Sequence, residues 1–274
     1  MGGAVSPFLR WAGSKRKLLP ELTSCWRADF GRYVEPFMGS AVLYFSLRPE
    51  NALLSDINAE LTEAFTAVRD TPDVIYELVS RLPQCKDGYY AVRSVSPREL
   101  TMQERAARFV YLNRFCFNGL YRTNNRGEFN VPYAGKKTPR LIDEGAFHAA
   151  ARALDGVTIE TGDFETVLRR NVRQGDFIYL DPPYAVRNQR IFRQYGPETF
   201  GLLDLERTAA LLRWIVQQGA SFVLSYAKSP ESDTYFSEWP TRLVEAQRNI
   251  AGFADRRRKA VEALVSSDAT LIDA

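Results

Sequence analysis

Short apolar runs alternate with helical patterns in the first and last parts of this 274-residue chain. The runs have the length of strands, and the segments between them carry apolar residues at helical spacing. This alternation predicts an α/β sheet covered by helices, among them helices at 42–47 and 205–218. Strands are expected at 33–35, 52–55, 157–161, 177–180 and 222–226, with weaker candidates at 242–247 and 260–265.

The middle of the chain, residues 63–148, has a different character. It begins with helical patterns at 73–82 and 102–115 and continues as a stretch crowded with Asn, Gly, Pro, Arg and Lys. A long irregular stretch inside a compact chain is usually functional. We therefore expect a catalytic domain built from residues 1–62 and 149–274, into which residues 63–148 are inserted as a helical, loop-rich domain.

The predicted strand at 177–180 is followed directly by Asp181, Pro182, Pro183 and Tyr184. Two consecutive prolines continue neither a helix nor a central strand. The chain is therefore predicted to leave the strand abruptly and to expose a carboxylate and an aromatic ring. Such a pocket suits a planar substrate with an amino group, for example an extruded nucleobase. The alternative is a simple Pro-Pro turn.

A second pattern indicates a cofactor pocket. The first predicted strand runs into a tight turn at Gly39, where the backbone can approach a ligand at the carboxyl end of a strand. The next strand ends at Asp56, which is placed to accept hydrogen bonds from ribose hydroxyls. A helix N-cap is the alternative for Asp56. Asp163 adds a carboxylate after the third strand. Neither a G-x-G-x-x-G fingerprint nor a Walker loop is present.

Composition narrows the class of protein. The chain has 45% hydrophobic and 25% charged residues, which is ordinary for a soluble globular protein. No run approaches the length of a membrane span, and the N-terminus lacks the pattern of a signal peptide. Cys25, Cys85 and Cys116 are far apart and odd in number. They predict neither a metal site nor a disulfide framework, which fits a reducing cytoplasm.

Basic residues are concentrated in two places although the net charge is only +3. Between Arg93 and Arg140 there are ten Lys or Arg and three acids, and a second cluster covers residues 256–259. Such patches neutralise nucleic-acid phosphates. A solvated protein surface is the alternative for either cluster.

Six segments together resemble the DNA adenine methyltransferase (Dam) family, the alpha group of N6-adenine enzymes. They follow the order of that family nearly from end to end, at 8–15, 35–40, 56–58, 113–122, 126–132 and 181–184. The resemblance implies S-adenosyl-L-methionine as methyl donor and duplex DNA as substrate. It also implies a mixed seven-stranded, doubly wound sheet with an inserted target-recognition domain.

The resemblance implies roles for individual residues. Those expected at the cofactor are Trp11, Ala12, Gly13, Lys15, Glu35, Phe37, Gly39, Asp56, Asp163, Phe164 and Asp181. Asp56 would bind the ribose, whereas Phe37 and Gly39 would line the methionine end. The segment at 8–15 has an alternative, an N-terminal arm docked on the core. No metal is expected. Ala41 and Ser14 depart from the pattern, since many relatives carry glycine there.

Asp181, Pro182, Pro183 and Tyr184 are the expected catalytic residues. The exocyclic amine of adenine is a poor nucleophile, so the enzyme needs acceptors aimed at its two hydrogens rather than a strong base. The Asp181 carboxylate and the Pro182 carbonyl are the candidates, and preorganised dipoles of this kind stabilise developing charge. Tyr184 would stack on the extruded base. His148, expected in a polar linker, is not needed as a base.

Arg122 is the main candidate for reading DNA sequence, because an arginine can contact O6 and N7 of guanine together. Its neighbours predict a loop or β-ribbon that enters the major groove. The full set of expected DNA contacts is Arg10, Phe117, Asn118, Leu120, Arg122, Asn124, Arg126, Pro132, Lys136 and Lys137. Phosphate contacts or plain surface positions are the alternatives. The loop after Pro132 lacks an aromatic residue of the enterobacterial pattern.

The sequence therefore predicts a cytoplasmic, monomeric DNA adenine-N6 methyltransferase acting on a short site that contains GAT, with GATC favoured. A restriction endonuclease is a possible functional partner. The alternatives are an N4-cytosine or different-site enzyme of the same fold, a non-catalytic DNA-binding regulator, and an enzyme acting on RNA.

Overall fold

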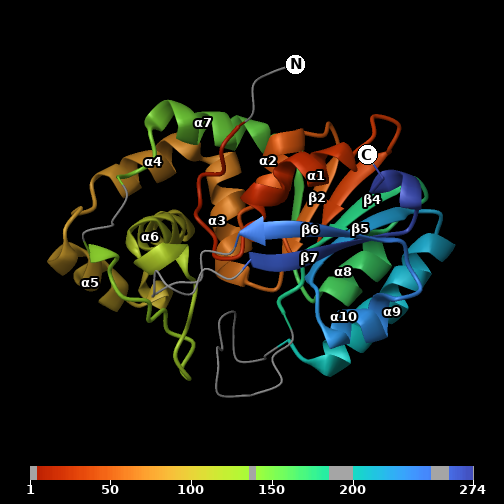
Figure 1. Cartoon of the computed structure of the whole chain (residues 1–274). Helices are drawn as coiled ribbons and strands as arrows, with labels where there is room; N and C mark the ends of the chain where they lie inside the picture. Colours follow the sequence, from red (N-terminus) through yellow and green to blue (C-terminus); the bar gives the residue numbers. More distant parts are fainter. Residues whose placement is uncertain (1–4, 136–139, 185–199, 248–258, 274) are drawn as a thin grey trace.

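The computed structural model describes residues 5–135, 140–184, 200–247 and 259–273 (Figure 1). One seven-stranded sheet organises the chain, and its strand order is β3-β2-β1-β4-β5-β7-β6. All seven expected strands are present. They are β1 (Arg32–Glu35), β2 (Ala52–Asp56), β3 (Thr158–Thr161), β4 (Asp176–Leu180), β5 (Ser221–Ala227), β6 (Thr241–Gln247) and β7 (Lys259–Ser266).

The sheet is mixed, as predicted. Strands β1 to β5 run parallel, and β7 lies antiparallel between β5 and β6. The carboxyl ends of the parallel strands therefore meet at one edge, together with the amino end of β7. Strand order reverses between β1 and β4, and ligands of open α/β sheets bind at such a switch point.

Helices cover both faces of the sheet (Figure 1). The described α-helices are α1 (Leu19–Ser24), α2 (Val42–Leu47), α3 (Ala59–Asp70), α4 (Pro72–Ser80), α5 (Lys86–Ser94), α6 (Met102–Phe115), α7 (Glu144–Ala153), α8 (Phe164–Asn171), α9 (Leu202–Gln217) and α10 (Pro230–Phe236). Alternate residues of β4 face opposite cores. Phe177 and Tyr179 pack on the first, and Ile178 and Leu180 pack on the second.

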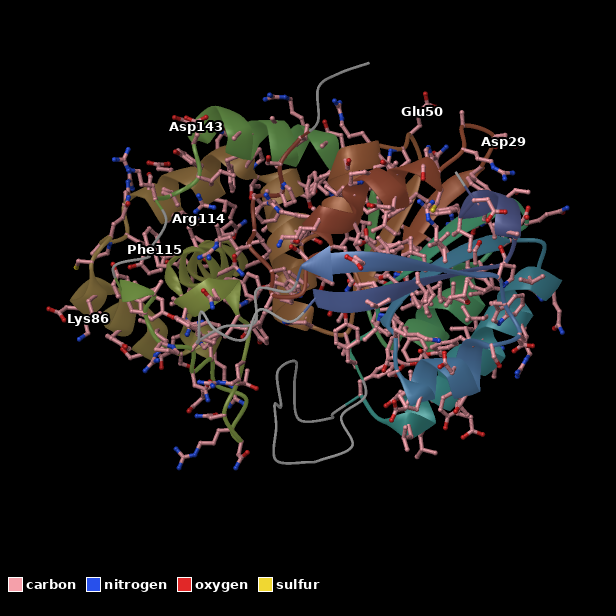
Figure 2. The ribbon with its side chains drawn as sticks, viewed as in Figure 1. Asp29, Glu50, Lys86, Arg114, Phe115 and Asp143 are labelled. Carbon is pink, nitrogen blue, oxygen red and sulfur yellow. The ribbon has the colours of Figure 1, made fainter. Side chains whose placement is uncertain are left out.

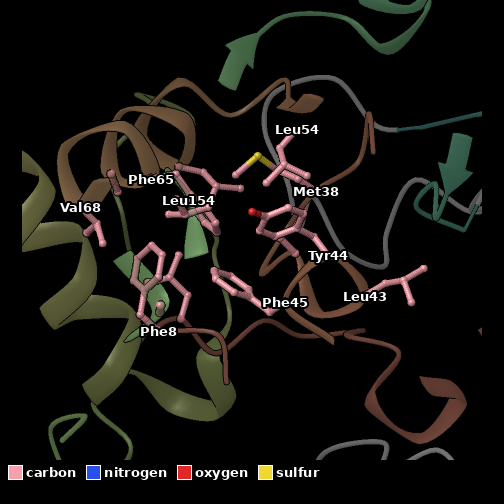
Figure 3. Close-up of a cluster of buried hydrophobic side chains, with 14 of the residues drawn as sticks. Phe8, Met38, Leu43, Tyr44, Phe45, Leu54, Phe65, Val68 and Leu154 are labelled. Carbon is pink, nitrogen blue, oxygen red and sulfur yellow. The ribbon is translucent and has the colours of Figure 1, made fainter. Parts of the chain in front are cut away.

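The helices α4 to α6 extend away from the sheet (Figure 1). They share the first core with the sheet, because Tyr89 on α5 and Tyr111 on α6 belong to the same buried cluster as Tyr33 on β1. In this core the Phe8 ring lies 4.7 Å from that of Phe65 on α3 (Figure 3). Charged side chains such as Asp29 and Lys86 lie exposed at the periphery (Figure 2). The division into two domains stays a prediction, and its boundaries after residues 62 and 148 fall inside α3 and α7.

One local expectation was wrong. His148 lies on α7 rather than in a polar linker, and its ring contacts those of Tyr76 and Phe147, each at 5.9 Å between centroids. The buried residues Phe147, Ala150 and Ala151 do have helical spacing, but only Phe147 is large and apolar, so the pattern is easily missed. Within the described ranges, no helix has the length and apolarity needed to cross a membrane.

Candidate active site

A cavity of about 470 Å³ opens at the carboxyl edge of the sheet among the described residues. Every residue that the sequence predicts for the cofactor or for catalysis lines it. These are Trp11, Ala12, Gly13, Lys15, Glu35, Phe37, Gly39, Asp56, Asp163, Phe164, Asp181, Pro182, Pro183 and Tyr184. The fold thus brings together segments that are far apart in sequence, and their individual roles remain predictions.

The turn after β1 forms one wall of the cavity. Gly39 has a φ of +45°, in the left-handed region that favours glycine. A Cβ at this position would lie 2.7 Å from Cδ1 of Trp11, so the turn has no room for a side chain. Ala41, where many relatives carry glycine, also has a positive φ of 50°. An L-residue in this region costs about 1–2 kcal/mol, which the surrounding packing must offset.

Asp56 fastens this turn to the end of β2. Its carboxylate accepts hydrogen bonds from the amide of Gly39 at 3.2 Å and from the amide of Asn58 at 3.0 Å. Burial raises the pKa of Asp56 to about 6, although these backbone donors oppose the shift. The N-cap of α3 is Asn58, which accepts from the amides of Glu60 and Leu61. The helix-cap alternative for Asp56 is therefore wrong.

Aromatic rings form another part of the cavity wall. The Phe164 ring lies 5.1 Å from Phe37 and 6.2 Å from Phe200, measured between centroids. The guanidinium of Arg207 lies 4.8 Å from the centre of the Phe164 ring. Such a wall offers stacking surface for a planar ring.

Arg207 also organises the acids beside this wall. It donates to Asp163 at 2.7 Å, to Glu165 at 2.9 Å and to Asp204 at 3.0 Å. Asp163 in addition accepts from the amide of Thr166 and caps α8. The sequence predicted Asp163 at this rim but missed Arg207, because nothing in the local pattern of α9 distinguishes it from a surface arginine.

The opposite end of the cavity holds a buried ion pair. Nζ of Lys15 lies 2.5 Å from Oδ1 of Asp181, and Oγ of Ser225 donates to the same oxygen at 3.1 Å. Burial raises the pKa of Asp181 above its usual value, and the Lys15 ammonium opposes the shift. Burial by itself would lower the pKa of Lys15, but Asp181, Tyr184 and Glu262 together outweigh it and the pKa rises. Each of the two groups therefore favours the charged form of the other.

Glu35 adds a further buried carboxyl at the end of β1. It is 3% exposed and accepts a hydrogen bond from the Tyr33 hydroxyl at 3.0 Å. Burial raises the pKa of Glu35 well above its usual range, and the nearby carboxylates of Asp181 and Asp56 add to this shift. Burial and the two neighbouring carboxylates thus favour the protonated form of Glu35.

Two residues that the sequence did not predict complete the site. Ser225 on β5 bonds Asp181, and Glu262 on β7 accepts from the Tyr184 hydroxyl. Their positions follow from strand pairing, because Ala227 of β5 lies opposite Glu262. A single acid within the apolar run at 260–265 was the available signal for Glu262.

The segment expected to read DNA forms a ribbon below α6 (Figure 1). An antiparallel bridge joins Thr123 to Phe129. At the tip, Oδ1 of Asn124 accepts from the amides of Arg126 and Glu128 at 2.9 and 3.0 Å. The sequence left open a loop or a β-ribbon, and the ribbon is present.

Arg122 stands at the base of this ribbon. Its Nε donates to Oδ1 of Asn130 at 2.7 Å, which fixes the guanidinium on one strand of the ribbon. The exposed candidates are Phe117, Asn118, Asn124, Arg126 and Pro132. Leu120 is half buried and packs on the core, so its side chain offers little surface to DNA. Lys136 and Lys137 lie outside the described residues.

Arg10 is tied to the same region by its backbone. Its amide donates to Oδ1 of Asn113 at 2.9 Å, and its carbonyl accepts from Nδ2 of Asn113 at 2.6 Å. One guanidinium nitrogen of Arg10 also donates to the carbonyl of Arg114. Arg10 therefore lies between the cavity segment that contains Trp11 and the segment that follows α6.

The sheet order and the cavity at its carboxyl edge define an α/β enzyme with the methyltransferase fold. Residues 11–250 match the family model described as D12 class N6 adenine-specific DNA methyltransferase. The chain belongs to this family.

Similar proteins cover nearly the whole chain. The chain is 32% identical to the Type II methyltransferase M1.LlaDCHI of Lactococcus lactis subsp. cremoris, over 96% of this chain and 95% of that protein. It is 31% identical to the Type II methyltransferase M.MjaIII of Methanocaldococcus jannaschii, over 95% and 98% of the two chains. It is 30% identical to the DNA adenine methylase of Haemophilus influenzae, over 93% and 91%. These findings confirm the predicted family.

Proposed function

We propose that this protein transfers a methyl group from S-adenosyl-L-methionine to N6 of an adenine flipped out of a short site in duplex DNA. One observation carries the proposal. The Asp181–Tyr184 segment, with its acceptors and its ring, lines the same cavity as the Gly39 turn and Asp56. A target base and a cofactor would therefore share one enclosed space.

The described residues fit this cofactor. The cavity lining has five carboxyl groups, of Glu35, Asp56, Asp163, Asp181 and Asp204, and two cations, of Lys15 and Arg207. Even with Glu35 neutral, the surplus of negative charge favours a ligand that carries positive charge. Asp56 would accept from the ribose hydroxyls, Phe37 would line the methionine end, and Phe164 would border the adenine ring. When bound, S-adenosyl-L-methionine supplies an electrophilic methyl group on a sulfonium.

Asp181 and Pro182 would act on the target amine by accepting its two hydrogens. Both hydrogen bonds to Asp181 reach Oδ1, so we assign Oδ2 to the amine. The Lys15 ammonium would favour the ionised form of this carboxylate, which is an acceptor only. Acceptors held in place before the reaction stabilise the charge that develops on nitrogen. Tyr184 would stack on the base and offset part of the few kcal/mol lost on unstacking.

The ribbon between residues 122 and 130 would read the DNA site. Arg122 is assigned to guanine, and GATC is the proposed site because the segment at 113–122 resembles that of Dam enzymes. Two of the similar proteins carry Type II methyltransferase names, which supports a role beside a restriction endonuclease. A monomeric state and a cytoplasmic location remain predictions.

Tritiated methyl transfer to unmethylated duplex DNA, followed by methylation-aware sequencing, tests the function. We expect methyl-adenine at one short motif. The variant Asp181→Asn should lose transfer about 10²–10³-fold while it still binds the cofactor. Asp233→Asn, at an exposed position on α10, is the matched control and should transfer normally. Methylation of cytosine, or of RNA in preference to duplex DNA, would contradict the proposal.

A further inference from the structure

Strand β7 brings a buried carboxylate to the catalytic segment. Because β7 runs antiparallel to β5, its first residues lie at the edge where the parallel strands end. Glu262 is opposite Ala227 in this pairing and is only 2% exposed. A carboxylate is seldom buried to this degree without hydrogen-bonding partners. Its contacts therefore indicate what it does.

Glu262 is bonded to the hydroxyl of Tyr184. This hydroxyl lies 2.9 Å from Oε1 and 3.1 Å from Oε2 of Glu262, so its single hydrogen is directed at the carboxylate. The same oxygen accepts from Nζ of Lys15 at 3.3 Å. The Tyr184 hydroxyl thus has a donor on one side and a charged acceptor on the other. Hydrogen bonds to charged groups are the stronger kind.

The ring of Tyr184 has a second contact. It packs against Tyr226 of β5 with 5.3 Å between centroids and an interplanar angle of 79°. Nζ of Lys15 lies 5.3 Å from the centre of the Tyr184 ring. Tyr184 therefore contacts two adjacent strands, β5 through its ring and β7 through its hydroxyl.

We propose that Glu262 is a positioning residue for methyl transfer, which sets the orientation of the Tyr184 ring by holding its hydroxyl. The inference rests on the proposed function, since the orientation matters only if the ring stacks on the target adenine. A base placed about 1 Å from its reactive position loses up to about 10²-fold in rate. Glu262 acts on the base through Tyr184 and therefore does not have to contact the substrate itself.

A double-mutant cycle tests the inference. Tyr184→Phe keeps the ring and removes the hydroxyl, and Glu262→Ala removes the acceptor. Each single variant should lower kcat about tenfold, within the range of a charge-assisted hydrogen bond. The affinity for S-adenosyl-L-methionine should change less than about twofold. In the Tyr184→Phe background, Glu262→Ala should cause no further loss, because the two changes remove the same contact.

Two further variants support the cycle. Glu262→Gln retains an acceptor oxygen of the same reach and should keep kcat near that of the unmodified protein. Glu262→Asp keeps the charge but is one methylene shorter, so it should lower kcat as much as Glu262→Ala does. If Glu262→Ala does not fold, Glu262→Asp tests the positioning role in its place. Glu245→Ala, at an exposed position on the neighbouring strand β6, is the matched control.

The outcomes separate the two proposals. Equal losses of kcat from Glu262→Ala with and without the Tyr184 hydroxyl would show that Glu262 acts independently of this hydroxyl and would overturn the positioning role. Unchanged kcat in Tyr184→Phe or in Glu262→Asp would overturn it too. If the unmodified protein itself transfers no methyl group to adenine, the proposed function fails instead.

Discussion

Lys15 and Asp181 are 166 positions apart in the chain, and their side chains meet at 2.5 Å at the end of β4. The side chain of Lys15 is 9% exposed and that of Asp181 is 20% exposed. The pair therefore joins the N-terminal segment to the catalytic segment in a place that water reaches poorly. Because of this contact, each charge offsets part of the desolvation cost of the other.

Removal of one charge should destabilise the fold more than removal of both. Lys15→Met removes the positive charge beside Asp181 and leaves the hydrogen bond from Ser225. It should cost about 3 kcal/mol of unfolding free energy, the lower end of the range for a broken buried pair. Lys15→Met combined with Asp181→Asn should recover at least half of this loss. Chemical denaturation of Lys15→Met, Asp181→Asn and the double variant measures the three unfolding free energies. A loss in the double variant equal to the sum of the two single losses would contradict the expectation.

The affinity for the cofactor should depend on pH through Asp56. Burial raises the pKa of this carboxyl to about 6, so it is protonated in much of the unliganded protein at pH 5 and ionised at pH 7. Ribose hydroxyls bind the ionised form better. Affinity should therefore rise about tenfold from pH 5 to pH 7 and then level off, following the ionised fraction.

Titration calorimetry across this pH range provides the measurement. Asp56→Asn should bind more weakly at every pH and should lose the dependence between pH 5 and 7. A dependence that persists in Asp56→Asn would assign it to another group, such as Glu35, whose pKa burial also raises.

Gly39→Ala should damage the cavity more than an ordinary glycine substitution does. Gly39 and Gly156 both have positive φ, of 45° and 75°, but only Gly39 has a neighbour in the way, Cδ1 of Trp11 at 2.7 Å. Gly156→Ala should cost about 1–2 kcal/mol for the left-handed backbone. Gly39→Ala should cost a further 1–3 kcal/mol or so for overpacking and should weaken cofactor binding. Equal losses of unfolding free energy in Gly39→Ala and Gly156→Ala would show that Trp11 moves aside freely.

Arg122 and Arg126 should differ in their effect on DNA binding. Arg122 is held at the base of the ribbon by Asn130, whereas Arg126 lies exposed at its tip. Arg122→Ala should lose about 1–3 kcal/mol of discrimination at one guanine. Arg126→Ala should weaken binding to all duplexes alike. It should also lower the slope of log binding constant against log salt concentration by about one. Binding to duplexes with 7-deazaguanine, which lacks the N7 acceptor, checks the assignment. Discrimination that survives in Arg122→Ala would contradict it.

Much of the fold was predictable from local pattern. The run at 177–180 is apolar throughout and that at 222–226 has Ser225 as its one polar residue, because strands buried on both faces have no solvent side. The glycine turn, Asp56 and Asp181 were also predictable, because each lies at or shortly after the end of a strand. His148 was misplaced although Phe147, Ala150 and Ala151 have helical spacing, because only one of these three residues is large and apolar.

The sequence by itself determined the strands, the glycine turn and the Asp-Pro-Pro-Tyr segment, since these depend on neighbours along the chain. Only the tertiary structure decided how the site is completed. Arg207 lines the cavity, and Ser225 and Glu262 bond residues that line it, because strand order and helix packing join residues far apart in sequence. The helix-cap role of Asp56 was excluded in the same way, because Asn58 caps α3 while Asp56 accepts from the amide of Gly39. Contacts of this kind arise from the direction and pairing of whole elements, which a local pattern does not contain.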